Sequence, residues 1–113
     1  MGRKEFLDFM REEIKLTKLI EKITKIRWDD EKEVYFDRDN NILEWTDYEM
    51  IDIPNPIPYK DEENDVEDNI DGVLYFGDGT IEFHFQECMD AENWARFDIE
   101  TMRKVIAELE SLA

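Results

Sequence analysis

Residues 73–86 carry the pattern that most restricts the fold of this chain, because apolar and polar side chains alternate on both sides of Asp78-Gly79. Alternation with a period of two indicates strands, and Asp-Gly between them indicates a two-residue hairpin turn. This turn pairs Gly77 with Thr80 and so sets the register of the hairpin. In that register one buried face carries Leu74, Phe76, Ile81, Phe83 and Phe85, and the other face carries Tyr75, Glu82 and His84.

A second hairpin is predicted earlier in the chain. Turn-forming residues at 37–41 separate two short strands, 34–36 and 42–46. A loop of two or of four residues gives the same register, which pairs Asp37 with Ile42, Phe36 with Leu43 and Val34 with Trp45. Residues 48–53 either extend the second strand or form a short helix.

The two ends of the chain are predicted to be helical. Residues 3–27 contain no Gly or Pro, and their apolar side chains recur every three or four residues, which is the helical period. The last helix is expected to begin at Asp98, because Asp is a good N-cap. Its apolar stripe comprises Ile99, Met102, Ile106 and Leu109, with Val105 and Leu112 beside it. A further antiparallel strand is expected at 94–97, although one long helix from Asp90 also fits those residues.

The N-terminal helix carries two apolar stripes rather than one. The main stripe comprises Phe9, Leu16, Ile20 and Ile23, with Phe6 at its margin. The second stripe, made of Leu7, Met10 and Ile14, lies well round the helix from the first. It predicts contact with the C-terminal helix, a break in the helix near residues 12–15, or a surface kept for a partner such as a second copy in a homodimer.

These elements together predict an α+β fold. The expected architecture is an antiparallel sheet of four to five strands, formed by two hairpins and a possible fifth strand and packed by an N-terminal and a C-terminal helix. At 113 residues the chain has the length of a single domain, 1–113, with one hydrophobic core.

The negative charge of the chain is concentrated in its middle. Residues 29–71 hold 17 Asp and Glu against three basic residues, whereas residues 1–28 hold eight basic against five acidic residues. The densest part, 61–71, follows Pro54–Pro58, which contains all three prolines. Proline excludes a helix or a central strand, and the acidic run has few apolar anchors, so we expect an acidic, mobile loop at 54–71.

No catalytic or metal-binding pattern is found in the sequence. His84 and Cys88 are four residues apart, which is about 13 Å on an extended segment, so they do not form a nucleophile–base pair. Residues 37–41 resemble the start of an EF-hand loop, but Ile42 stands where that loop needs Gly and Tyr48 where it needs Glu. We therefore expect no catalytic residue, no metal ligand, no cofactor and no enzymatic activity.

The formal net charge of −17 narrows the classes of partner. It disfavours direct binding to nucleic acid or to an anionic membrane, and it favours a basic protein such as a nucleic-acid-binding protein or a nuclease. The first six residues are charged where a signal peptide needs an apolar run, and the single Cys88 cannot form an internal disulfide. We expect a cytoplasmic protein, which includes the cytoplasm of a phage-infected host cell.

An acidic surface of this kind suits mimicry of a polyanion. Carboxylates along an extended segment have a spacing close to that of DNA phosphates, and aromatic side chains among them can serve as anchors. The residues predicted to bind the partner are Trp45, Asp47, Tyr48, Glu49, Asp52, Tyr59, Asp61, Glu62, Glu63, Asp65, Glu67, Asp68 and Asp71. The expected function is that of a small non-catalytic inhibitor of the anti-CRISPR or anti-restriction type. An immunity protein that neutralises a basic nuclease toxin is the alternative, and a self-associating or scaffold protein is a further one.

Overall fold

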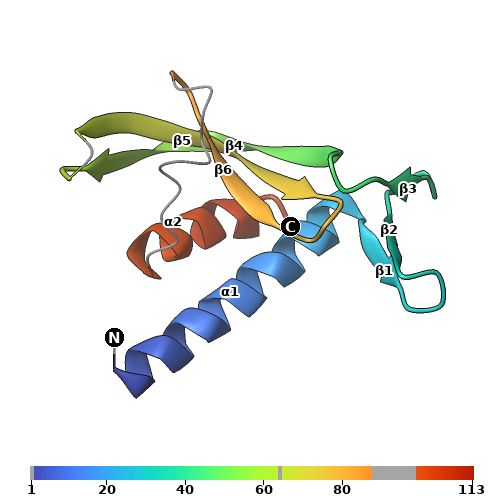
Figure 1. The fold of residues 1–113 in the computed structure, drawn as a ribbon. Helices are drawn as coiled ribbons and strands as arrows, with labels where there is room; N and C mark the ends of the chain where they lie inside the picture. The colour runs from blue at the N-terminus through green and yellow to red at the C-terminus, as the bar shows by residue number, and fades with distance from the viewer. Residues whose placement is uncertain (1, 64, 88–98) are drawn as a thin grey trace.

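The computed structural model describes residues 2–63, 65–87 and 99–113 and has an α+β fold (Figure 1). In chain order its elements are α1 (Arg3–Thr24), β1 (Arg27–Asp29), β2 (Val34–Phe36), β3 (Ile42–Leu43), β4 (Tyr48–Asp61), β5 (Val66–Phe76), β6 (Ile81–Phe85) and α2 (Ile99–Glu110). The strand expected at 94–97 and the Asp98 cap of the last helix lie outside the described residues.

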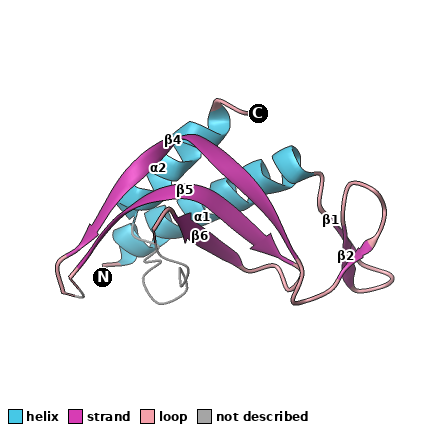
Figure 2. Cartoon of the chain, turned by 90° about the horizontal axis from the view of Figure 1, so that it is seen from above, coloured by secondary structure: helices cyan, strands magenta, loops and turns pink. Residues whose placement is uncertain are grey.

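The described strands form two three-stranded antiparallel sheets, not the single sheet of four to five strands that we predicted. Their orders are β1-β2-β3 and β4-β5-β6. Both helices lie on one face of the β4-β5-β6 sheet (Figure 1). Strands β4 and β5 arch over the helices, and the β1-β2-β3 sheet lies at one end of the molecule (Figure 2). The two predicted hairpins therefore belong to different sheets.

The hydrophobic core lies between the two helices and the covered face of the β4-β5-β6 sheet. The predicted helical stripes supply part of it, through the buried side chains of Leu16, Ile20, Met102, Ile106 and Leu109. The sheet supplies Ile51, Ile53, Ile57, Val73, Phe83 and Phe85. Full burial of an apolar side chain of this size contributes about 1.5–3 kcal/mol, so this cluster is the main source of stability.

Helix α1 ends three residues earlier than predicted, because Lys25 adopts a left-handed conformation with φ of 65°. The Lys25 N–H donates to the Glu21 carbonyl at 2.9 Å. The Thr24 hydroxyl donates to the Ile20 carbonyl at 2.8 Å and accepts the Ile26 N–H at 3.3 Å. These bonds satisfy the last turn of the helix and direct Ile26 into the core.

The β5-β6 hairpin forms where predicted, but its register differs by one residue from the prediction. Residues 77–79 form a three-residue loop in which Gly79 has φ of 84°. The Phe76 N–H donates to the Thr80 carbonyl at 2.9 Å, so Thr80 lies opposite Phe76 rather than Gly77. A three-residue loop with a left-handed last residue therefore replaces the expected two-residue turn.

This shift turns the side chains of β5 over, because a slip of one residue moves each side chain to the other face. Val73 and Tyr75 are 0% and 1% exposed and join the core, whereas Leu74 and Phe76 lie on the opposite face, where Leu74 is still buried at 9% exposure. The prediction for β6 is correct, since its alternate residues Ile81, Phe83 and Phe85 face the core.

The β2-β3 hairpin differs from its prediction in the same way. Residues 38–40 form a three-residue loop in which Asn40 has φ of 64°. The Asp37 carboxylate stabilises the loop by accepting the N–H groups of Asp39 at 2.9 Å and Asn41 at 3.0 Å. The observed pairs are Phe36 with Ile42 and Tyr35 with Leu43, not Asp37 with Ile42, Phe36 with Leu43 and Val34 with Trp45.

The two aromatic side chains of β2 point to opposite faces, as consecutive residues of a strand do. Tyr35 lies on the core side, where its ring is 4.9 Å from that of Trp28 and 5.8 Å from that of Tyr75. Phe36 lies on the opposite face, covered by the cationic groups of Arg27 at 5.0 Å and Lys32 at 5.4 Å. The Tyr35–Tyr75 contact joins the small sheet to the large one.

The prediction of a loop at 54–71 is wrong, because β4 and β5 both extend into this segment and pair with each other. The register between them shifts between Asp52 and Ile57, and this irregular stretch contains Pro54 and Pro56. Proline is tolerated there because β4 is an edge strand in the sheet order. Pairing with β5 supplies the backbone partners that the acidic segment lacks by itself.

The buried hydroxyl of Tyr75 makes the stability of this fold sensitive to alkaline pH. Tyr75 is 1% exposed, and its hydroxyl donates to Glu21 Oε1 at 3.3 Å. Burial, together with the neighbouring Tyr35 and Glu21, raises the pKa of Tyr75 far above its ordinary value of 10.0. The folded protein keeps a proton that the unfolded chain releases above about pH 10, so this stability is present below that pH and is lost as the pH rises.

We expect the free energy of unfolding to fall by up to about 1.4 kcal/mol per pH unit between about pH 10 and pH 12 through this one group. Urea denaturation of the Tyr75→Phe variant should lack this component. The control Tyr48→Phe, at a position that is 55% exposed, should retain it. Equal slopes for the wild type and Tyr75→Phe would contradict the assignment.

Candidate functional site

The paired ends of β4 and β5, 57–61 and 66–70, form a two-stranded ribbon with the connecting residues 62, 63 and 65, and we call it the acidic ribbon. The Asp65 N–H donates to the Glu62 carbonyl at 3.4 Å where the chain reverses. The predicted site residues that are exposed on the ribbon are Glu62, Glu63, Asp65 and Glu67. Strand pairing therefore holds these carboxylates at one end of the molecule.

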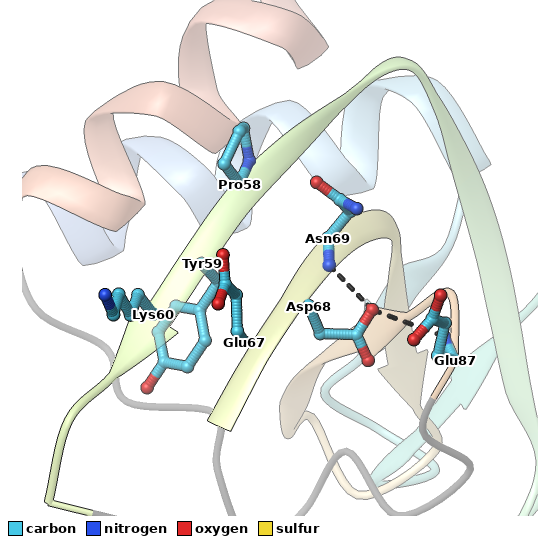
Figure 3. A pocket seen from close by; sticks show the side chains of 7 residues that line it. All are labelled: Pro58, Tyr59, Lys60, Glu67, Asp68, Asn69 and Glu87. Carbon is cyan, nitrogen blue, oxygen red and sulfur yellow. Dashed lines mark hydrogen bonds between the residues drawn. The ribbon is translucent and has the colours of Figure 1, made fainter. Parts of the chain in front are cut away.

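Asp61 and Asp68, also predicted to bind the partner, are instead buried in the ribbon at 7% and 8% exposure. The Asp61 carboxylate accepts the Glu63 N–H at 3.1 Å. The Asp68 carboxylate accepts the N–H groups of Asn69 at 2.7 Å and Glu87 at 3.3 Å (Figure 3). These two carboxylates organise the ribbon and tie it to the end of β6, rather than display charge to a partner.

A hollow of about 320 Å³ lies on the ribbon beside Asp68 (Figure 3). It is lined by Pro58, Tyr59, Lys60, Glu67, Asp68, Asn69 and Glu87. Tyr59, a predicted anchor, is only 6% exposed because its ring packs against Phe85 with centroids 5.3 Å apart. The hollow has three carboxylates and one ammonium group around it, so it suits the cationic end of a Lys or Arg side chain better than an anion.

Other predicted site residues lie at the opposite end of β4. This strand has 14 residues, roughly 40 Å if fully extended, and Tyr48 begins it whereas Asp61 ends it. Tyr48 and Asp52 are exposed on the face away from the helices. Glu49 points to the covered face, where it is opposite the buried Tyr75. The predicted site is therefore split between the two ends of the sheet.

Trp45 and Asp47 belong to the tight turn that precedes β4. Trp45 is 71% exposed, the most exposed of the large apolar side chains in the described residues. The Asp47 carboxylate accepts the Glu44 N–H at 3.2 Å and so fixes the turn. Trp45 thus lies beyond the end of β3, not within a strand as predicted.

Asp71 pairs with a histidine that the sequence did not connect to it. A register irregularity in β5 falls between Ile70 and Gly72, and it brings Asp71 Oδ1 to 2.5 Å from His84 Nδ1. Asp71 is therefore engaged within the molecule. No sequence signal indicated this pair, because the two residues are 13 positions apart and meet only through the irregularity. Cys88, which we compared with His84, lies outside the described residues.

The second apolar stripe of α1 is exposed, with 44% for Leu7, 40% for Met10 and 50% for Ile14. Helix α1 is continuous, so the break expected near residues 12–15 does not occur. Helix α2 contacts α1 beside the stripe without covering it, through Arg103 with Glu12 at 3.4 Å and Lys15 with Glu110 at 3.5 Å. The stripe is an open surface of the described structure.

Among the described residues, no three or more His, Cys, Asp or Glu side chains are grouped as a metal site. Neither α1 nor α2 is both long and apolar enough to cross a membrane. Comparisons of the chain with known protein families, with curated proteins and with solved structures give no match. The function has to be inferred from the surfaces of this chain alone.

Proposed function

We propose that this chain is a small non-catalytic binding protein whose acidic ribbon docks on the basic, nucleic-acid-binding surface of a partner. In this role it would inhibit a nuclease or a defence complex, as anti-CRISPR and anti-restriction proteins do. The observation that carries the proposal is the gathering of Glu62, Glu63, Asp65 and Glu67, all exposed, at one end of a paired ribbon.

An ordered ribbon supports this role better than the predicted mobile loop. Fixing the backbone of one flexible residue costs about 1–2 kcal/mol of conformational entropy, and a loop would lose that freedom on binding. In the ribbon the pairing of 57–61 with 66–70 holds Glu67 and both ends of the turn, and hydrogen bonds from the Glu63 and Asp65 N–H groups hold the turn itself. More of the interaction energy is then available as affinity.

The arrangement of the carboxylates suits a cluster of Arg and Lys side chains. The four exposed carboxylates fall within positions 62–67, with Glu62, Glu63 and Asp65 on the turn and Glu67 at the start of β5, so they form a dense cluster of negative charge. Lys60 Nζ lies 4.0 Å from Glu62 Oε1 at the surface, a contact that contributes little and that a partner can replace. Binding of this kind is fast and salt-dependent.

An immunity protein that neutralises a basic nuclease toxin would use the same surface. Its partner would again present the cationic groups that normally hold nucleic acid. The two proposals differ in the identity of the partner and not in the chemistry of the acidic ribbon.

Neutralising the exposed carboxylates should weaken capture of the partner at least about fourfold. The ribbon variant combines Glu62→Gln, Glu63→Gln, Asp65→Asn and Glu67→Gln, and it keeps the buried Asp61 and Asp68. Exposed charge pairs contribute about 0.2–1 kcal/mol each, so four contribute up to about 4 kcal/mol. The immobilised protein captures proteins from a nuclease-bearing lysate, and a DNA duplex of about 20 base pairs then elutes them at constant salt concentration.

The matched control removes the same number of charges elsewhere, through Glu5→Gln, Glu13→Gln, Glu31→Gln and Asp39→Asn, all at exposed positions. The wild type and this control should capture the same nucleic-acid-binding proteins, and the duplex should release them. Capture that resists excess duplex, or equal capture by the ribbon variant, would refute the proposal.

A further inference from the structure

Two surfaces on opposite sides of the molecule combine exposed apolar side chains with charge. One is the side of α1 that points away from the core, which we call the outer face of α1. The other is the face of the β4-β5-β6 sheet opposite the helices, which we call the outer sheet face (Figure 1). The charges on these two surfaces have opposite signs.

The outer face of α1 is apolar along its centre, with most of its basic residues along one border and Glu13 and Glu21 along the other. The exposed apolar residues of its centre are Leu7, Met10 and Ile14. The basic residues around them are Arg3, Lys4, Arg11, Lys15, Lys18 and Lys22. Hollows of about 390 and 440 Å³ lie between the basic side chains, with Leu7 in the first and Ile14 and Leu19 in the second.

Most of these basic groups have no ionic partner in the described part of the chain. Arg11 lies 3.8 Å from Asp8, and Lys15 lies 3.5 Å from Glu110. The other four basic side chains make no ion pair with a described residue. Solubility alone would account for such lysines, but not for three exposed apolar side chains placed among them.

The outer sheet face also has exposed apolar side chains near the start of β4, but the charge beside them is negative. Tyr48 and Met50 are 55% and 38% exposed, and the Tyr48 ring packs on Phe76 with centroids 5.4 Å apart. Asp52 is the next exposed residue on this face of β4, and Trp45 is exposed in the turn before the strand. An apolar centre beside the exposed carboxylate of Asp52 is the counterpart of the outer face of α1.

We propose that the outer sheet face of one molecule binds the outer face of α1 of a second copy, so that copies associate head to tail. An antiparallel α1–α1 dimer would bring the two basic borders together, and like charges across an interface disfavour it. In the head-to-tail contact, the apolar centres meet and the lysines of α1 lie near Asp52. Because it joins two different patches, the contact can add further copies.

The size of the contact indicates weak association. Helix α1 has 22 residues, so at about 1.5 Å per residue and about 10 Å of width its outer face covers only about 330 Å². Stable interfaces bury about 800 Å² on each partner, and smaller ones are transient. We expect association that is seen only at high protein concentration. Salt at about 0.15 M screens charges beyond about 8 Å, so the net charge of −17 does not prevent the local contact.

Sedimentation velocity of the full chain at concentrations up to about 500 µM tests this proposal, with the mean mass expected to rise with concentration. The α1-face variant, Ile14→Ser with Lys18→Glu, should stay monomeric. The sheet-face variant, Tyr48→Ser with Asp52→Lys, should also stay monomeric. The matched control changes an exposed leucine and an exposed lysine on the C-terminal side, Leu112→Ser with Lys104→Glu, and should associate as the wild type does.

An equimolar mixture of the two monomeric variants distinguishes the head-to-tail contact from other contacts. Each variant keeps one intact surface, so the mixture should form dimers and no larger species, which also shows that both variants are folded. A monomeric wild type at about 500 µM, a mixture that does not associate, or a sheet-face variant that dimerises alone overturns the proposal. If the wild type stays monomeric but sediments with phosphatidylglycerol vesicles, the outer face of α1 binds a lipid surface. That result would also overturn the proposal.

Discussion

The Gly77→Ala variant is expected to lose about 3 kcal/mol or more of unfolding free energy. A Cβ atom at this position would overlap the carbonyl oxygen of Glu44 and would lie 2.5 Å from its carbonyl carbon. The carbonyl oxygen of Leu43 would be 2.7 Å away. These are backbone atoms, and the Gly77 N–H fixes the same turn by donating to the Asp47 carbonyl at 2.9 Å. The turn and the β5-β6 loop cannot both keep their places around an added methyl group.

Urea denaturation followed by circular dichroism measures this loss, and the other glycines provide a graded control. Gly2→Ala should change stability by less than about 0.5 kcal/mol, since nothing lies within 4 Å of the new atom. Gly72→Ala should fall between the two, because its nearest neighbour at 2.6 Å is the flexible end of Met50. A Gly77→Ala variant as stable as Gly2→Ala would mean that the turn does not pack on the loop in solution.

Truncation of Phe83 to alanine is expected to cost about 4 kcal/mol, or about 15 °C in Tm. Phe83 is 0% exposed and lies opposite Val73 in the middle of the β5-β6 pair. Its removal leaves a cavity between the sheet and the helices, so the lost contacts add to the lost burial. Thermal unfolding and urea denaturation should agree on the size of the loss.

The control for this variant is Phe6→Ala on α1, where the ring is 52% exposed. The same atoms are deleted, but little apolar surface is returned to water, and alanine favours the helix. We expect a change of less than about 0.5 kcal/mol. Similar losses for the two variants would place the core elsewhere in the molecule.

The helices could be predicted from the sequence because their signals are local. The apolar spacing of Leu16 and Ile20, and of Met102 and Ile106, needs no knowledge of the rest of the chain. The hairpin registers could not be predicted in this way. Turn sequences rich in Asp, Asn and Gly fit two-residue and three-residue loops alike, and the choice is decided by which side chains of β5 reach the core. Strand β1 has only three residues and forms through its pairing with β2.

The acidic segment shows why composition alone misled the prediction of a loop. Few of its residues are apolar, but Ile57 and Tyr59 are buried, and Phe85 packs on Tyr59 from β6. The contact with Phe85 comes from a segment that is distant in the sequence, so no local window contains it. Long-range pairing therefore overrode the local preference of a charged, proline-containing stretch.

The candidate site was predictable only where charge density coincides with a turn. Glu62 and Glu63 follow the end of β4 and are exposed for that reason. Asp61 and Asp68 look identical to them in the sequence, yet the alternation of the strands turns both inward. The contact of Asp71 with His84 depends on an irregularity in β5, which no pattern in the sequence predicts.

The three prolines of β4 lie on the border of the large sheet, and none of them has an N–H group to offer an incoming strand. An edge strand that keeps all its backbone N–H donors is a template on which identical chains can stack into fibrils. Here this edge is interrupted at Pro54, Pro56 and Pro58. The acidic residues that follow them also repel an identical chain. The β4 edge is therefore a poor template for fibril growth at the high concentrations at which the weak association proposed above would be seen.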